Sequence, residues 1–305
     1  MEAAASKLKL MFLETRPQFL ILTPVAFSVG IAMAVYQGAF NGLHLILALI
    51  GSVCAHISVN VLNDYVDYVR GTDKLTKRTP FSGGSGLLPE GLLKPRDALN
   101  LGIGALIVGL LIGAYFIYLY PILIVIVVLA ALLAVIYTPI LTRVYITELF
   151  PGIGFGPLLV LGAYITQLPP EKVLISSQAI WASIPVGILV SNLLWVNEIP
   201  DYEADIKTGR RHGVILVGKR NAAIAFVIML ALAYLFIVIP VVLKIIPALT
   251  LLGLLTIPIA VKASQVALKN YNQSDKLVPA LGQNVLVVLG TPALMTIGLL
   301  LARFL

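Results

Sequence analysis

The chain has 305 residues, of which 59% are hydrophobic and only 11% are charged. Soluble domains carry about 25% charged residues, so this composition excludes an ordinary soluble protein and indicates one that crosses a membrane many times. The net charge of +7 does not indicate a nucleic-acid partner, because the basic residues lie in loops between apolar segments and not on one basic face.

A helix of about twenty apolar residues crosses the hydrocarbon core of a bilayer, and several segments have about that length. The nine predicted spans are Pro17–Tyr36, Gly42–Leu62, Ala98–Leu119, Pro121–Tyr137, Val144–Tyr164, Ser177–Val196, Asn221–Ile239, Val241–Val261 and Pro279–Phe304. We therefore expect an all-α polytopic membrane bundle of nine transmembrane helices, folded as one domain over residues 1–305. The junctions at Tyr120-Pro121 and Ile239-Pro240 leave almost no loop, which predicts tight antiparallel hairpins.

Lysine and arginine indicate the orientation, because short cytoplasmic loops are enriched in these residues. With nine spans, 18 of the 21 basic residues fall in the N-terminal segment and in the loops that follow the even-numbered spans. We therefore expect a cell-membrane protein whose N-terminus and cap loops face the cytoplasm and whose C-terminus lies outside.

Two polar motifs lie at the cytoplasmic ends of the second and sixth predicted spans. They read Asn60-Val-Leu-Asn63-Asp64-Tyr-Val-Asp67 and Asn197-Glu198-Ile-Pro-Asp201-Tyr-Glu-Ala-Asp205. Asn60 and Asn197 are 137 residues apart, as are Asp64 and Asp201. On a helix the acids of the first motif share a face, where like charges repel one another unless a cation lies close by.

The repeat indicates two related halves, roughly 17–140 and 144–305, each of which contributes one acidic helix. Magnesium is the expected cation, since carboxylates, water and phosphate oxygens are its usual ligands. Basic residues follow both motifs and favour a metal-bound polyanion over a cation pathway; they are Arg70, Lys74, Lys77, Arg78, Lys207, Arg210 and Arg211. Within the second motif, Pro200 predicts a kink of the helix.

A third element, Tyr137-Thr138-Pro139 followed by Arg143, lies between the fourth and fifth predicted spans. Together with the two motifs and with Gly71-x-Asp73, it resembles the UbiA superfamily of intramembrane aromatic prenyltransferases over nearly the whole chain. With the Ser82-Gly83-Gly84 loop, the first motif is most similar to the branch that prenylates dihydroxynaphthoate for menaquinone.

This resemblance implies a Mg²⁺-dependent transfer of an isoprenoid chain from a prenyl diphosphate to an aromatic quinone precursor through an allylic carbocation. It implies that the metal ions are held by the four motif aspartates, Asp64, Asp67, Asp201 and Asp205. The residues expected to bind the diphosphate are Asn60, Arg70, Lys74, Arg143, Asn197 and Lys207. Tyr137 is expected to stabilise the carbocation through its ring, and the expected catalytic residues are Tyr137, Arg143, Asp64 and Asp201.

Other functions fit parts of the pattern. A secondary transporter with an acidic cation site also has repeated halves and charged residues within the membrane, although near the bilayer midplane. A CDP-alcohol phosphatidyltransferase also uses acidic helices and metal, but its Asp-Gly-x-x-Ala-Arg element does not occur in this sequence. Prenyl transfer to a glycerol phosphate lipid also stays open. The three histidines, His44, His56 and His212, show no metal-ligand spacing.

Overall fold

The computed structural model describes residues 2–71 and 84–305, and the regular structure of these residues is helical. The α-helices are α1 (Glu2–Glu14), α2 (Pro17–Leu20), α3 (Leu22–Tyr36), α4 (Gly42–Arg70), α5 (Pro95–Leu119), α6 (Leu123–Ile136), α7 (Leu149–Ile153), α8 (Leu159–Ile165), α9 (Ser177–Thr208), α10 (Gly213–Val242), α11 (Ile257–Asn270) and α12 (Ser274–Phe304). Short 3₁₀ or π-helical turns extend or connect them; these are η2 (Leu141–Arg143), η3 (Gly154–Leu158), η4 (Pro170–Lys172) and η5 (Ala248–Thr256).

In the described part of the chain, seven helical segments are long and apolar enough to cross a membrane. Two shorter apolar segments, Leu123–Ile136 and Leu149–Ile165, lie where two further spans are predicted. An all-helical bundle of the multi-pass membrane type is therefore confirmed for the described residues, whereas the count of nine crossings stays a prediction.

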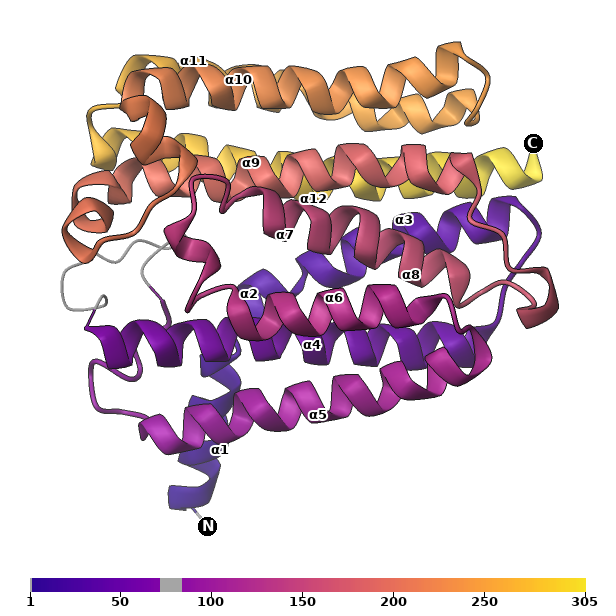
Figure 1. Cartoon of the computed structure of the whole chain (residues 1–305). Helices are drawn as coiled ribbons and strands as arrows, with labels where there is room; N and C mark the ends of the chain where they lie inside the picture. The colour runs from indigo at the N-terminus through magenta and orange to yellow at the C-terminus, as the bar shows by residue number, and fades with distance from the viewer. Residues whose placement is uncertain (1, 72–83) are drawn as a thin grey trace.

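The helices that carry the two acidic motifs, α4 and α9, finish at the same end of the bundle, opposite the end where the C-terminus lies (Figure 1). Both helices are followed by a glycine in the left-handed region, Gly71 at φ 74° and Gly209 at φ 75°. The N–H groups of these glycines donate to the carbonyl oxygens of Asp67 and Asp205 respectively, the last acid of each motif. The two motifs therefore share not only their acidic residues but also the same left-handed glycine cap at the end of the helix.

The helix of the second motif, α9, is continuous although Pro185 and Pro200 lie inside it. The kink expected at Pro200 therefore does not interrupt the motif. Gly156 of η3 lies so close to α9 that a Cβ on it would be only 2.5 Å from the Cα of Gly187. This approach sets η3 directly against α9 and forms one wall of the cavity described below.

The predicted hairpin at Ile239-Pro240 is wrong, because Pro240 lies inside α10. The chain turns later, where Lys244 adopts φ 57° and the N–H groups of Ile245 and Ile246 both donate to the carbonyl oxygen of Pro240. A proline removes only the hydrogen bond of its own nitrogen, and its carbonyl can still close the following turn. The other tight hairpin forms as predicted, since α5 and α6 are separated by residues 120–122 alone.

Candidate active site

A cavity of about 460 Å³ lies between the two motif helices. At one end its lining consists of the motif side chains, and the rest of its wall comes mainly from apolar residues of α5, α6, η3 and α8. Gly51 of α4 and Gly109 of α5 lie in this apolar wall, where the two helices pack so closely that a Cβ on Gly109 would be 3.4 Å from the carbonyl oxygen of Gly51. The cavity therefore suits a ligand that has a charged head and an apolar tail.

Side chains from both motifs line the acidic end. Asn60 and Asp67 reach it from α4, whereas Asn197, Asp201 and Asp205 reach it from α9. The two motifs thus face one common cavity although they are distant in sequence.

The guanidinium group of Arg210, in the short segment between α9 and α10, joins the two motifs. Its Nη2 donates to Oδ2 of Asp67 at 2.6 Å, and its Nη1 lies 3.7 Å from Oδ1 of Asp205. Burial lowers the pKa of Arg210, but the carboxylates of Asp67 and Asp205 outweigh that effect and raise the pKa above its usual value. Arg210 is therefore charged and offsets part of the repulsion between the acids.

Asp64 is buried and does not belong to the described lining of the cavity. Its Oδ2 accepts a hydrogen bond from the N–H of Ser85 at 2.6 Å, and its Oδ1 lies 3.6 Å from Nη1 of Arg16. Gly84 packs directly on this carboxylate at φ 71°, and the Ser85 hydroxyl donates to Oε2 of Glu14 at 2.7 Å. Asp64 is thus held by protein groups beside Gly84, which does line the cavity.

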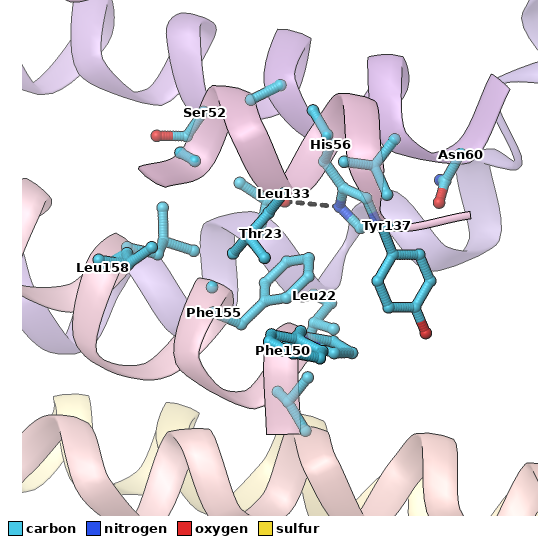
Figure 2. A pocket seen from close by; sticks show the side chains of 18 of the residues that line it. Leu22, Thr23, Ser52, His56, Asn60, Leu133, Tyr137, Phe150, Phe155 and Leu158 are labelled. Carbon is cyan, nitrogen blue, oxygen red and sulfur yellow. Dashed lines mark hydrogen bonds between the residues drawn. The ribbon is translucent and has the colours of Figure 1, made fainter. Parts of the chain in front are cut away.

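Tyr137 follows α6 and lines the cavity (Figure 2). The turn after it is fixed to the end of α4, because the Thr138 hydroxyl donates to Oδ1 of Asn63. Arg70 adds two hydrogen bonds of 3.1 Å, to the carbonyl oxygens of Thr138 and Pro139. The helix of the first motif therefore positions Tyr137.

Three basic residues that the sequence assigns to the diphosphate do not belong to the described lining of the cavity. Arg70 is bound to the turn after Tyr137, whereas Arg143 and Lys207 are exposed. Lys207 follows Asp205 by two helical positions, so it points to nearly the opposite side of α9. A fourth such residue, Lys74, lies outside the described residues.

Within the described lining, Arg16 and Arg210 are the arginines at the acidic end. Arg16 lies between α1 and α2 in the left-handed region, at φ 57°, and its guanidinium sits 4.6 Å from the ring centre of Phe19. Sequence reasoning assigned Arg16 only to the basic N-terminal segment, because no motif marks which arginine of that segment turns inward.

A buried cluster of Glu148, Glu198 and His212 adjoins the second motif, and its ligand atoms lie within 4.8 Å of one another, so it could hold a metal ion. His212 places Nε2 3.1 Å from Oδ2 of Asp205 and Nδ1 3.4 Å from Oε2 of Glu198. Oε1 of Glu148 accepts a hydrogen bond from the N–H of Gly213 at 2.8 Å. Sequence reasoning missed this cluster although Glu198 belongs to the second motif, because Glu148 and His212 lie in other segments and share no spacing with it.

His56 lies on α4, one turn before Asn60, and also lines the cavity (Figure 2). The hydroxyl oxygen of Thr23 is 2.7 Å from Nδ1 of His56. The ring of Phe155 packs edge-on against the imidazole, with 4.8 Å between the ring centres. Thr23 and Phe155 line the same cavity, so the imidazole is held between two elements of its wall.

The acidic end fits Mg²⁺. Its donors are carboxylate and amide oxygens, which are the hard ligands that this ion prefers. Three aspartates, Asp67, Asp201 and Asp205, line it, and two of them share the charge of Arg210. Oδ1 of Asn197 is buried and has no hydrogen-bond partner among the described residues, so it is available as a further oxygen ligand.

Comparisons with known proteins identify relatives of this chain. The sequence profile described as the UbiA prenyltransferase family matches residues 21–288. The 1,4-dihydroxy-2-naphthoate octaprenyltransferase of Bacillus subtilis (strain 168) is 29% identical over 242 residues, which cover 73% of this chain and 71% of that protein. The apo structure of a UbiA homolog from Aeropyrum pernix K1 has a TM-score of 0.69 at 18% identity and covers 91% of this chain and 97% of its own. A UbiA homolog from Archaeoglobus fulgidus bound to DMAPP and Mg²⁺ has a TM-score of 0.62 at 14% identity, over 94% of this chain and 99% of its own.

Proposed function

The chain belongs to the UbiA prenyltransferase family, and we propose that it transfers an isoprenoid chain from a prenyl diphosphate to an aromatic acceptor of the dihydroxynaphthoate type. The resemblance to this family and to its dihydroxynaphthoate branch, inferred from the sequence motifs, is confirmed by the relatives. One observation carries the proposal, namely that Arg210 joins Asp67 to Asp205 at the acidic end of a cavity whose remaining walls are mainly apolar. The acidic end suits a metal-bound diphosphate, and the apolar walls suit a prenyl chain.

In this proposal the motif side chains hold the metal ions against the diphosphate. The ligands are the carboxylates of Asp64, Asp67, Asp201 and Asp205, oriented with the help of Asn60 and Asn197. Bound there, Mg²⁺ would supply positive charge to the departing diphosphate. The geometry supports this assignment best for the residues that line the cavity from both helices.

Arg16 and Arg210 supply fixed positive charge at the same end. Their side chains are only 14% and 27% exposed, so solvent screens their charge less than it would at the surface. We assign them to the diphosphate in place of Arg143 and Lys207. Their preorganised charges stabilise the leaving group as the bond between the first prenyl carbon and the diphosphate oxygen breaks.

Breaking that bond leaves an allylic carbocation, which water would capture as a prenyl alcohol. The apolar lining of α5, α6 and α8 excludes water from the cavity. The ring of Tyr137, next to the acidic motifs, stabilises the cation through its π electrons. The acceptor ring then forms the new carbon–carbon bond and loses a proton, for which the released diphosphate is an available acceptor.

We also propose that the chain is one domain of two related halves, roughly 17–140 and 144–305, with the N-terminus and the active site on the cytoplasmic side. The ends of α4 and α9 lie together at the end of the bundle opposite the C-terminus (Figure 1), which supports this orientation. The basic residues of the loops that follow both helices support it as well.

The test is a turnover assay in detergent with geranylgeranyl diphosphate, 1,4-dihydroxy-2-naphthoate and Mg²⁺. The expected result is a prenylated naphthoate with release of diphosphate, abolished by EDTA and restored by Mg²⁺. Parallel reactions contain 4-hydroxybenzoate or a glycerol phosphate lipid as acceptor. A product on the glycerol phosphate lipid and none on an aromatic acceptor would contradict the proposed acceptor class.

A further inference from the structure

The apolar part of the cavity has few polar side chains, and most of their hydrogen-bonding groups are used within the protein. The hydroxyls of Ser52 and Thr166 each donate to a carbonyl oxygen of the preceding helical turn, at 2.8 Å in both cases. The hydroxyl of Thr23 forms a hydrogen bond with Nδ1 of His56. Unlike these hydroxyls, Nε2 of His56 has no hydrogen-bond partner among the described residues.

The contact with Thr23 indicates which nitrogen of His56 carries the proton. Among the described residues, the Thr23 hydroxyl has no other hydrogen-bond partner, and a buried hydroxyl is best satisfied when it donates its proton. Nδ1 of His56 therefore accepts, and a neutral imidazole with this arrangement carries its proton on Nε2. The imidazole thus offers one hydrogen-bond donor to the cavity.

The position of His56 fits the place where the two substrates would meet. It precedes Asn60, the first residue of the first motif, by four positions, or about 6 Å along the helix axis. It therefore lies just beyond the acidic end, where the carbon released from the diphosphate begins the apolar part of the cavity. The side chains of Phe150 and Phe155 lie around this point (Figure 2) and offer apolar faces to an aromatic ring.

We propose that Nε2 of His56 donates a hydrogen bond to an oxygen substituent of the aromatic acceptor, and that Thr23 fixes the imidazole tautomer that makes this possible. The inference rests on the proposed function and adds a determinant of acceptor binding to it. An acceptor that carries hydroxyl or carboxylate oxygens would leave one of them unpaired in an apolar cavity without such a donor. His56 therefore favours oxygen-substituted rings over hydrocarbon rings of the same shape.

The test compares the wild type with the variants H56F and T23V, using geranylgeranyl diphosphate, Mg²⁺ and 1,4-dihydroxy-2-naphthoate. Loss of one hydrogen bond predicts that H56F raises the KM for the naphthoate about tenfold more than it raises the KM for the prenyl diphosphate. T23V keeps the imidazole but removes the hydroxyl that selects the tautomer with the proton on Nε2. It should therefore raise the KM for the naphthoate about threefold. T23S should retain the wild-type value, and S264A is the matched control, because it removes a hydroxyl bonded to its own helix at 2.8 Å outside the lining of the cavity.

Acceptor analogues make the test specific. The compounds 1-hydroxy-2-naphthoate and 1,4-dihydroxynaphthalene each lack one oxygen substituent, and the wild type should bind one of them about tenfold more weakly. H56F should lose that discrimination. An equal rise of both KM values in H56F, or discrimination that persists in H56F and T23V, would overturn the assignment of His56. A wild type that releases no diphosphate with Mg²⁺ present would instead overturn the proposed function, and this inference with it.

Discussion

Nη2 of Arg210 lies 2.6 Å from Oδ2 of Asp67, although the two residues belong to different halves of the sequence. The same guanidinium lies 3.7 Å from Oδ1 of Asp205, so one cation bridges the last acid of each motif. The repeat seen in the sequence therefore corresponds to a spatial pair of acidic groups around a shared positive charge. In our account, divalent ions and a diphosphate bind between the same groups.

Removal of the bridging cation should destabilise the metal-free protein. R210A leaves Asp67 and Asp205 close together without their shared partner, which we expect to cost about 1–3 kcal/mol, less than for a fully buried pair because Arg210 is partly exposed. Mg²⁺ should recover more of the melting temperature in R210A than in the wild type, since it replaces the missing charge. Thermal unfolding in detergent with EDTA or with Mg²⁺ measures both effects.

The neighbouring residue provides the control for that experiment. Arg211 is exposed, and its N–H donates to the carbonyl oxygen of Thr142 regardless of the side chain. R211A should therefore melt like the wild type in both buffers. If R210A also melts like the wild type, the bridge between the motifs is not a significant contact.

Neutralising one motif acid should abolish turnover. D205N keeps the shape of the side chain but removes a charge assigned to metal binding, so we expect diphosphate release to fall at least about 100-fold. Glu203 lies two residues earlier on the same helix, with a side chain that is 65% exposed and bound to Lys219. E203Q should therefore stay within about twofold of the wild type, and comparable losses in both variants would argue against a specific metal role for Asp205.

The basic residues should divide into two groups according to how strongly their removal raises the KM for the prenyl diphosphate. R16A removes a guanidinium from the acidic end of the cavity, which should raise the KM for the prenyl diphosphate by about tenfold or more. R143A and K207A remove exposed charges and should change that KM by less than about threefold. The opposite ranking in steady-state kinetics would restore the assignment made from sequence alone and contradict the one made from the geometry.

Two substitutions of Tyr137 test its role in stabilising the carbocation. Y137F keeps the aromatic ring and should retain most of the turnover number, whereas Y137L should lose about 2- to 30-fold, the range expected for a cation–π contact of about 0.5–2 kcal/mol. Y137L should also form more prenyl alcohol than Y137F, because a less stabilised cation is more often captured by water. Equal turnover and equal prenyl alcohol formation in both variants would contradict a role of the Tyr137 ring in stabilising the carbocation.

The direction of the second motif could be predicted because it follows from local periodicity, whereas in the first motif Asp64 does not belong to the described lining. Helical spacing places Asn197, Asp201 and Asp205 on one face, and all three reach the cavity. The basic residues could not be sorted in the same way. Lys207 still belongs to α9 and its outward direction follows from the helix, whereas Arg210 comes after Gly209, where the backbone leaves the helix and its path depends on distant contacts.

The residues that sequence reasoning missed depend on contacts between distant elements. Glu148 meets His212 only because the segment before α7 packs against the turn before α10, and neither segment carries a recognisable spacing. His56 has an ordinary position in an apolar helix, and only the Thr23 contact and the cavity in front of it distinguish its imidazole from one buried in the core. Such assignments require the tertiary arrangement.

The most direct test of the shared site is the binding of geranyl thiolodiphosphate, an unreactive analogue, to the wild type, D67N and D205N by titration calorimetry with and without Mg²⁺. Our account predicts that Mg²⁺ strengthens binding of the analogue to the wild type and that this gain in affinity is lost in either variant. The reason is that one acid from each half helps to bind the same metal-bound diphosphate. A gain that survives intact in D67N or in D205N would contradict it.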